Sequence, residues 1–367
     1  MNAVEELQVA IVGGGQAGLA TAYELKRRGL SCAVLEADER VGDQWRRRWD
    51  SLQLFTPARL DALPGAAFPA PPGSFPGKDQ VADYLEAYSR ERELPVRTGV
   101  RVLKLARGDD SYRLETTAGT LGAQHVVVAT GYDKPKVPSF AADLRPAIRQ
   151  LNAAEYRNPS QLTGVVLVVG AGTSGVEVAM ESAGTGHHTV LAGRGTGSIP
   201  PVLHAFGGRL FWFFATRVAS LRTPIGRRMQ PRFLSQGAPL IRPQMRDAIA
   251  AGVERAPRVA AVEDGLPILE GGRRLEPDTI VWCTGFKRDY TWIDFDVTGP
   301  DGHPRQTGGV AEGEQGLYFV GLPFQTRFAS HLIGGVGEDA AFVAGQIAAR
   351  LGELRPRGVA EVAIAPG

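Results

Sequence analysis

Two glycine-rich loops carry the clearest chemical signal in this chain of 367 residues. Residues 13–18 read GGGQAG and residues 170–175 read GAGTSG, and each loop lies between a short apolar run and a segment with helical spacing. Such a loop lets the backbone approach a pyrophosphate, and the helix that follows offers free N–H groups at the positive end of its dipole. The sequence therefore predicts two dinucleotide sites, formed by Gly13, Gly15, Gln16, Ala17 and Gly18 and by Gly170, Gly172, Thr173, Ser174 and Gly175.

The residues that end the next strand of each copy differ in charge. Glu36 follows the first copy, where a carboxylate accepts hydrogen bonds from ribose hydroxyls and disfavours a 2′-phosphate. Arg194 occupies the matching place in the second copy, where a guanidinium suits a phosphate. The pair predicts one bound FAD and one diffusible NADPH, with hydride transfer between them.

A second repeated feature supports the same interpretation. The apolar run 126–128 leads into Ala129-Thr130-Gly131, and the run 279–282 leads into Cys283-Thr284-Gly285. Two features repeated with nearly one offset predict an α/β chain with two Rossmann-like dinucleotide-binding domains, as in disulfide-reductase architectures. Thr130 and Gly131 are then expected at the FAD site, and Thr284 and Gly285 at the NADPH site.

The motifs predict a discontinuous FAD-binding domain, 1–157 and 286–367, around an NADPH-binding domain, 158–285. Residues 197–248 are long for a Rossmann connection and predict a helical insertion that serves as a substrate lid, a dimer surface, a membrane-touching face or plain packing. Charges interrupt its most apolar stretch, 203–221, so no transmembrane span is expected. The stretch 57–76 indicates an irregular surface loop.

Composition and charge exclude several classes of function. A net charge of +2 argues against a nucleic-acid partner. Cys32 and Cys283 form no C-x-x-C pair, which excludes a dithiol redox centre and hence a disulfide reductase. No H-E-x-x-H or Cys/His cluster appears, so no metal is expected. The first residues lack a signal-peptide pattern, and we expect a cytoplasmic protein.

The combined motifs resemble those of flavin-containing monooxygenases, in the CzcO-like and YUCCA-like branch. The likeness includes GDQWR at 42–46, WDSLQLFTP at 49–57, GLYFVGLPFQ at 316–325 and HLIGGVGEDA at 331–340. Leu322 stands where disulfide and ferredoxin-type reductases usually carry Asp. The resemblance implies that NADPH reduces FAD, that O2 adds at flavin C4a and that one oxygen atom passes to a small organic substrate. It adds FAD contacts at Gln44, Trp45, Gly321, Gln325 and Asp339.

The family's fingerprint F-x-G-x-x-x-H-x-x-x-Y/F is largely lost here. Where it aligns, this chain keeps Tyr156 but has Asn152 in place of the His. The resemblance leaves candidate catalytic residues at Gln53, Thr56, Asn152, Gln325 and Arg327. The loss also keeps open an NADPH-dependent flavin reductase or oxidase that passes electrons to a quinone or a protein, and a flavin-binding protein without turnover. The insertion also allows a homodimer.

Overall fold

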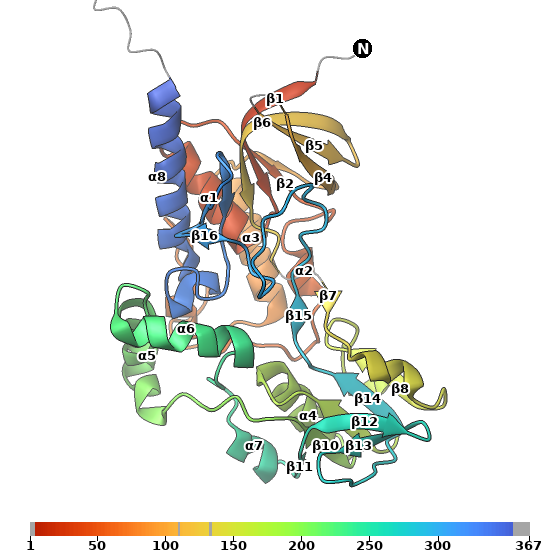
Figure 1. The fold of residues 1–367 in the computed structure, drawn as a ribbon. Helices are drawn as coiled ribbons and strands as arrows, with labels where there is room; N and C mark the ends of the chain where they lie inside the picture. Colours follow the sequence, from red (N-terminus) through yellow and green to blue (C-terminus); the bar gives the residue numbers. More distant parts are fainter. Residues whose placement is uncertain (1–3, 109–110, 132–133, 355–367) are drawn as a thin grey trace, which may run out of the picture.

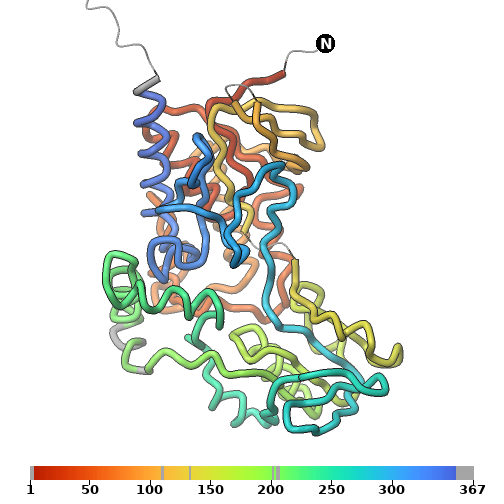
Figure 2. Tube along the Cα trace, viewed as in Figure 1, coloured from red at the N-terminus to blue at the C-terminus, as the bar shows by residue number. Residues whose placement is uncertain are grey.

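The computed structural model describes residues 4–108, 111–131 and 134–354. The chain forms two units, each built on a sheet with a parallel core, and helices pack on each sheet (Figure 1). This confirms the predicted α/β class with two Rossmann-like units. The tube in Figure 2 shows the chain leaving the first unit, building the second and returning to the first.

The first sheet has nine strands, and its parallel core runs in the order β18-β6-β1-β2-β3. Short antiparallel strands extend one edge, and a hairpin pairs with β6. The strands are β1 (Glu5–Val12), β2 (Ala33–Leu35), β3 (Val96–Arg97), β4 (Val102–Arg107), β5 (Tyr112–Thr116), β6 (Gly119–Val128), β16 (Gln306–Thr307), β17 (Val310–Ala311) and β18 (Leu317–Phe319).

Three helices cover one face of this sheet: α1 (Gln16–Lys26), α3 (Lys78–Glu91) and α8 (Val336–Leu354) (Figure 1). The apolar stripe of α3, with Val81, Leu85 and Tyr88, is buried between helix and sheet. The opposite face packs on the β4–β5 hairpin and on Tyr290, Ile293 and Val297. Both faces of the central strands are therefore buried, which explains why they are continuously apolar.

The second sheet is fully parallel, in the order β11-β10-β9-β14-β8. Its strands are β8 (Arg149–Asn152), β9 (Val166–Val169), β10 (Thr189–Ala192), β11 (Glu254–Ala256) and β14 (Thr279–Trp282). Helices α4 (Thr173–Gly184) and α7 (Met245–Ala250) pack together beside it. The hairpin of β12 (Val259–Glu263) and β13 (Leu266–Leu269) packs on the other face. Strand β8 thus belongs to the second sheet although it precedes residue 158, where we expected that unit to begin.

Two short antiparallel strands, β7 (Lys134–Pro135) and β15 (Phe286–Lys287), join the two crossings between the units. Between β10 and β11 the chain forms the expected helical insertion: η4 (Pro201–Gly208), α5 (Arg209–Phe213), the π-helical turn η5 (Phe214–Val218) and α6 (Pro224–Gln236). The remaining short helices are α2 (Asp43–Arg46), η1 (Ala58–Leu60), η2 (Ser139–Asp143), η3 (Pro159–Gln161) and η6 (Phe328–His331). In the described part of the chain, no helix has the length and apolarity needed to cross a membrane.

The two glycine loops make the same close contacts in both units. Gly13 and Gly170 have φ values of +110° and +113°, and an added Cβ would lie 2.6 Å from the carbonyl oxygen of Ala129 and 2.2 Å from that of Cys283. Each loop therefore rests against the end of the neighbouring strand, where the Thr-Gly motif begins. A Cβ on Gly18 would lie 1.9 Å from the carbonyl oxygen of Gly13.

We expect Gly18→Ala to lower the free energy of unfolding by about 1–3 kcal/mol, because backbone must move to admit the methyl group. Urea unfolding at saturating FAD measures the change. Gly345→Ala on α8 is the matched control, since nothing lies within 4 Å of its added Cβ, and it should stabilise slightly. If Gly18→Ala and Gly345→Ala lose equal free energies of unfolding, the close backbone contact at Gly18 is not what requires a glycine there.

Candidate flavin and nicotinamide sites

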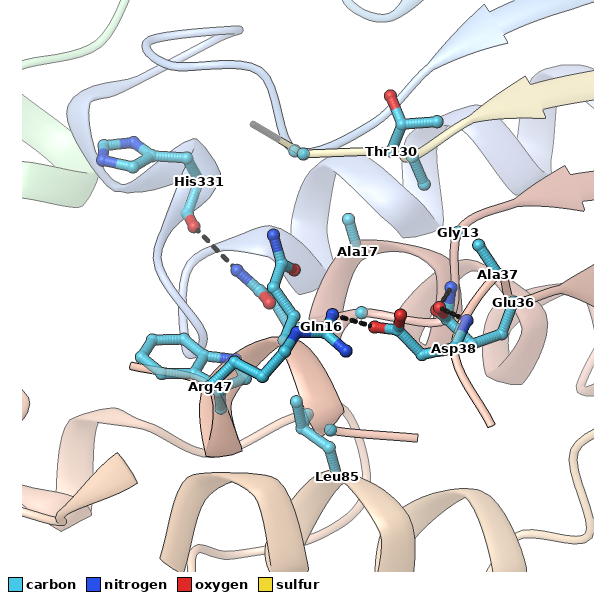
Figure 3. Close-up of a pocket in the computed structure, with 18 of the residues that line it drawn as sticks. Gly13, Gln16, Ala17, Glu36, Ala37, Asp38, Arg47, Leu85, Thr130 and His331 are labelled. Atoms are coloured by element: carbon cyan, nitrogen blue, oxygen red, sulfur yellow. Dashed lines mark hydrogen bonds and ion pairs between the residues drawn. The ribbon is translucent and has the colours of Figure 1, made fainter. Parts of the chain in front are cut away.

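A cavity of about 800 Å³ lies at the carboxyl ends of the first sheet's parallel strands. It begins at Glu36, passes the first glycine loop and reaches Thr56, Asp61 and His331. Figure 3 shows Glu36 and His331 on opposite sides of Gln16. Ligands of open α/β sheets bind at this edge, and the volume lies within the usual range for cofactor pockets.

Glu36 forms one end of the cavity and also supports the loop. Its carboxylate accepts the Gly14 N–H at 2.6 Å and the Asp38 N–H at 2.9 Å. Burial is the main cause that raises the pKa of this carboxyl, against the backbone hydrogen bonds that lower it. Two carboxylate oxygens carry about four acceptor positions, so two hydrogen bonds leave capacity for ribose hydroxyls.

The middle of the cavity combines a helix terminus with arginines. Gly15 caps α1 in an extended conformation, so the first N–H groups of the helix lie at the loop. Arg47, Arg48 and Arg157 also line the cavity, and Arg47 pairs with Asp38 at 2.5 Å. Burial lowers the pKa of Arg48, with further contributions from the charges of Arg157 and Arg47. Positive charge and free N–H groups together favour an anion here.

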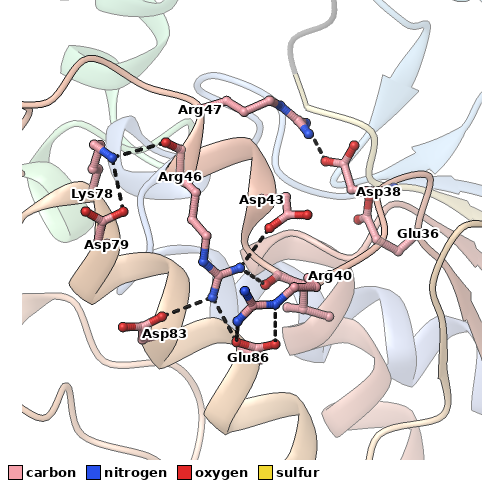
Figure 4. A network of polar contacts seen from close by, with 11 residues as sticks. Glu36, Asp38, Arg40, Asp43, Arg46, Arg47, Lys78, Asp79, Asp83 and Glu86 are labelled. Atoms are coloured by element: carbon pink, nitrogen blue, oxygen red, sulfur yellow. Dashed lines mark hydrogen bonds and ion pairs between the residues drawn. The ribbon is translucent and has the colours of Figure 1, made fainter. Parts of the chain in front are cut away.

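A network of ion pairs holds α2, which carries Gln44 and Trp45, against α3. The Arg46 guanidinium reaches Asp43 at 2.9 Å, Asp83 at 3.0 Å and Glu86 at 2.8 Å (Figure 4). Gly42, with φ +90°, lies so close to α3 that a Cβ would be 2.6 Å from the carbonyl oxygen of Ala82. The network positions Gln44 and Trp45, which both line the cavity.

The far end of the cavity contains a buried hydroxyl and carboxyl. Thr56 Oγ1 lies 2.6 Å from Asp61 Oδ1, and the two residues are 3% and 1% exposed. Asp61 Oδ2 is buried without a hydrogen-bond partner in the described structure. Burial raises the pKa of Asp61 to about 7, while the Thr56 hydrogen bond opposes the shift. The Asp61 carboxyl therefore titrates nearer to neutral pH than an exposed aspartate does.

His331 borders this end and remains uncharged. It packs against Phe233 of α6 and Phe328 of η6, with ring centroids 5.8 and 6.4 Å away. Burial, assisted by the charge of Arg288, lowers the pKa of His331 to about 4. The backbone carbonyl of His331 lies 3.4 Å from the Gln16 amide nitrogen, which joins the closing segment to the glycine loop.

The structure brings most of the predicted FAD residues together and leaves several candidates elsewhere. Those lining the cavity are Gly13, Gly15, Gln16, Ala17, Glu36, Gln44, Trp45, Thr130, Gly131, Gly321 and, among the catalytic candidates, Thr56. Gly18 packs beneath the loop. Gln53 lines a separate cavity of about 200 Å³ with Glu177 and Arg242. Asn152 ends β8 in the second sheet, and its side chain accepts the Ala154 N–H at 2.9 Å.

Gln325, Arg327 and Asp339 are all buried and make polar contacts within the protein. The Gln325 amide donates to the Phe319 carbonyl at 3.0 Å and accepts the Leu322 N–H at 3.2 Å. Arg327 is 7% exposed and pairs with Asp339 at 3.2 Å, so its guanidinium points into the protein and not to solvent. None of these three side chains lines the main cavity. Sequence reasoning missed Asp61, His331 and the arginines at 47, 48 and 157.

The second glycine loop repeats the first one's geometry. Gly172 caps α4 in an extended conformation, and a Cβ on Gly175 would lie 1.7 Å from the carbonyl oxygen of Gly170. Thr173 and Ser174 form the first turn of α4. Arg194 follows β10 and is exposed. The Thr284 hydroxyl donates to the Lys136 carbonyl, and the Gly285 carbonyl accepts the Lys136 N–H at 2.8 Å, so both belong to the crossing between the units.

Neither thiol is suited to redox exchange. Cys32 and Cys283 are both free, and neither lines the main cavity. Burial raises the pKa of Cys32 to about 11 and that of Cys283 to about 12. Thiol exchange requires a thiolate, and burial disfavours the thiolate of both cysteines. Within the described ranges, no group of three His, Cys, Asp or Glu side chains could hold a metal ion.

Comparisons with known proteins agree with this geometry. The pyridine nucleotide-disulphide oxidoreductase family matches residues 10–200. An uncharacterized CzcO-like oxidoreductase of Geobacillus kaustophilus is 36% identical over 93% of this chain and 98% of its own. The indole-3-pyruvate monooxygenase YUCCA4 of Oryza sativa is 28% identical over 94% of this chain and 88% of its own. A flavin-containing monooxygenase from Stenotrophomonas maltophilia superposes with a TM-score of 0.79, at 25% identity over 95% of this chain and 100% of its own.

The fold, the paired sites and these matches define an oxidoreductase of the pyridine nucleotide-disulphide oxidoreductase family. Within it, the chain belongs to the branch of CzcO-like and YUCCA-like flavoprotein monooxygenases. The predicted cofactors, FAD and NADPH, are confirmed for this family. The roles of individual residues remain predictions.

The buried carboxyl of Asp61 makes stability depend on pH. Its pKa of about 7 in the folded protein exceeds the value of roughly 4 in an unfolded chain. Between these values the folded state keeps a proton that the unfolded state releases, so the free energy of unfolding falls as pH rises. We expect Asp61→Asn to gain up to about 4 kcal/mol relative to wild type between pH ~4 and 7, measured by urea unfolding at equal FAD excess.

Thr56→Val supplies the matched control, because it removes the hydrogen bond that favours the ionised carboxyl. It should move the pH dependence of wild type to higher pH without abolishing it. A constant difference in the free energy of unfolding between wild type and Asp61→Asn across this pH range would show that folding does not raise the pKa of Asp61.

Proposed function

We propose that this protein is an FAD-dependent monooxygenase that consumes NADPH and inserts one oxygen atom from O2 into a small organic substrate. The observation that carries the proposal is a dinucleotide-sized cavity whose described lining includes a buried hydroxyl–carboxyl pair and no thiol. Bound FAD would supply the redox and oxygen-activating chemistry, after reduction by NADPH. The matches to flavin monooxygenases support this reaction class.

The first glycine loop fits FAD in charge and space. Glu36 would accept hydrogen bonds from the adenosine ribose, and the N–H groups at Gly15 and Gln16 would bind the pyrophosphate. Arg47 and Arg48 would add positive charge beside it. Because these contacts fix the adenosine and pyrophosphate positions, the flavin ring belongs at the far end, near Thr56, Asp61 and His331.

The Thr56–Asp61 pair would control where a hydrogen-bond donor points. When Asp61 is ionised, the Thr56 hydroxyl donates its hydrogen to Oδ1. When Asp61 is protonated, its own O–H can donate to Thr56 Oγ1, which frees the threonine hydrogen to point into the cavity. Burial excludes water from this pair, which strengthens any hydrogen bond that it makes.

The second loop fits NADPH through a similar helix terminus and an exposed arginine. The N–H groups at the start of α4 would bind the pyrophosphate, and Arg194 would pair with the 2′-phosphate that distinguishes NADPH from NADH. Gln53, Glu177 and Arg242 line the small cavity between the units, where substrate or nicotinamide groups would enter.

We expect Arg194→Ala to raise KM for NADPH by roughly 10-fold or more while KM for NADH changes little, because one charge-assisted phosphate contact is lost. Steady-state oxidation of both nucleotides measures the ratio. Arg149→Ala is the control. Arg149 begins β8 of the same unit and is also exposed, so its replacement should leave both KM values unchanged. If Arg194→Ala keeps the wild-type preference for NADPH over NADH, Arg194 does not bind the 2′-phosphate.

Incubation with NADPH and ¹⁸O₂ tests the reaction itself. We expect one labelled oxygen atom in a product from a panel of thioethers, amines and ketones, detected by mass spectrometry and dependent on NADPH. The competing reductase or oxidase function predicts rapid reduction of an added quinone and no labelled product. Quinone reduction without a labelled product would overturn the monooxygenase proposal but leave the assignment of FAD and NADPH intact.

A further inference from the structure

The helical insertion carries an unusual concentration of positive charge. Residues 182–246 include nine arginines and no Lys, Asp or Glu, whereas the whole chain has a net charge of only +2. Six of these arginines lie between 209 and 232, on α5, η5 and α6 and the turn that joins η5 to α6. The excess is therefore a local property of one structural segment.

The outer face of α5 and η5 mixes apolar and cationic side chains. Leu210, Phe213 and Arg217 follow the spacing that places them on one helical face, and all three are exposed. Phe213 is 61% exposed, although Phe211 and Ala215 on the inner face are fully buried. The same helical segment therefore buries Phe211 and Ala215 and leaves the large aromatic side chain of Phe213 exposed.

Helix α6 repeats this pattern. Ile225, Arg228 and Arg232 have the same spacing on its outer face and are exposed, with Ile225 at 51%. Met229 and Phe233 lie on the inner face and join the same apolar cluster as Phe211. Helices α5 and α6 share this inner cluster and lie beside each other on one side of the molecule (Figures 1 and 2), so their exposed residues belong to the same region of the surface.

The arginines of this face have no acidic partner among the residues that the structure describes. In the described parts of the chain, the side chains of Arg209, Arg217, Arg222, Arg227, Arg228 and Arg232 enter no ion pair. The Arg227 guanidinium donates to the Leu221 carbonyl, and that of Arg232 to the Gln236 amide oxygen. Their charge is therefore available to an anionic partner.

We propose that the outer face of α5, η5 and α6 binds the surface of a membrane that contains anionic lipids. Apolar side chains that alternate with arginines on exposed helices are the composition of an interfacial segment, which lies on a bilayer without crossing it. A second copy of the chain is a poor partner, because a twofold interface would place the same arginines opposite one another.

Vesicle flotation tests this surface directly. Wild-type protein with its flavin should float with vesicles of phosphatidylcholine and phosphatidylglycerol, less at high salt, and not with phosphatidylcholine alone. Arg228→Glu/Arg232→Glu should weaken binding by ~10-fold or more. Phe213→Ser should weaken it while keeping the salt dependence.

Arg90→Glu/Arg113→Glu is the matched control, because it removes the same charge from two exposed arginines outside the insertion. It should bind nearly as wild type does, and all variants should retain flavin. If the control loses as much vesicle binding as Arg228→Glu/Arg232→Glu does, binding depends only on the overall charge of the protein, and the proposal is overturned. Failure of wild type to float, or a dimer that Arg228→Glu/Arg232→Glu converts to monomer, would also overturn it.

Discussion

Both nucleotide sites depend on a backbone contact that no side chain could enter. Each glycine loop touches the carbonyl oxygen that ends a neighbouring strand, at Ala129 in one unit and at Cys283 in the other. This contact fixes the loop, and the loop places the start of α1 or α4 where its free N–H groups would meet the pyrophosphate that we propose. The Thr-Gly motif repeats for the same reason. In each unit it begins at the strand end that contacts the glycine loop.

This dependence explains why so much of the fold could be predicted from the sequence. A positive φ and a close backbone approach require glycine at particular spacings, so the requirement is visible locally in residues 13–18 and 170–175. The membership of β8 in the second sheet could not be predicted in this way. Its partner β14 lies more than a hundred residues away, and no local pattern specifies that pairing.

The end of the main cavity near Thr56 and Asp61 was harder to predict for a related reason. Asp61 lies in the stretch 57–76, which looks like a surface loop, but Ala58, Leu63 and Phe68 are buried in the core. These apolar residues were the available signal that the segment packs inward. Arg327, at the start of η6, pairs with Asp339 of α8, and only the folded chain shows that neither side chain lines the cavity.

The insertion connects this interior chemistry to the molecular surface. Its inner face contributes Phe233, which packs on His331, and His331 borders the end of the cavity where we place the flavin ring. Its outer face carries the exposed arginines and Phe213. One two-sided segment therefore lies between the cavity end at His331 and the surface formed by its outer face. If that face rests on a lipid surface, the cavity end lies one helix layer from the bilayer, and apolar molecules dissolved there have a short path to it.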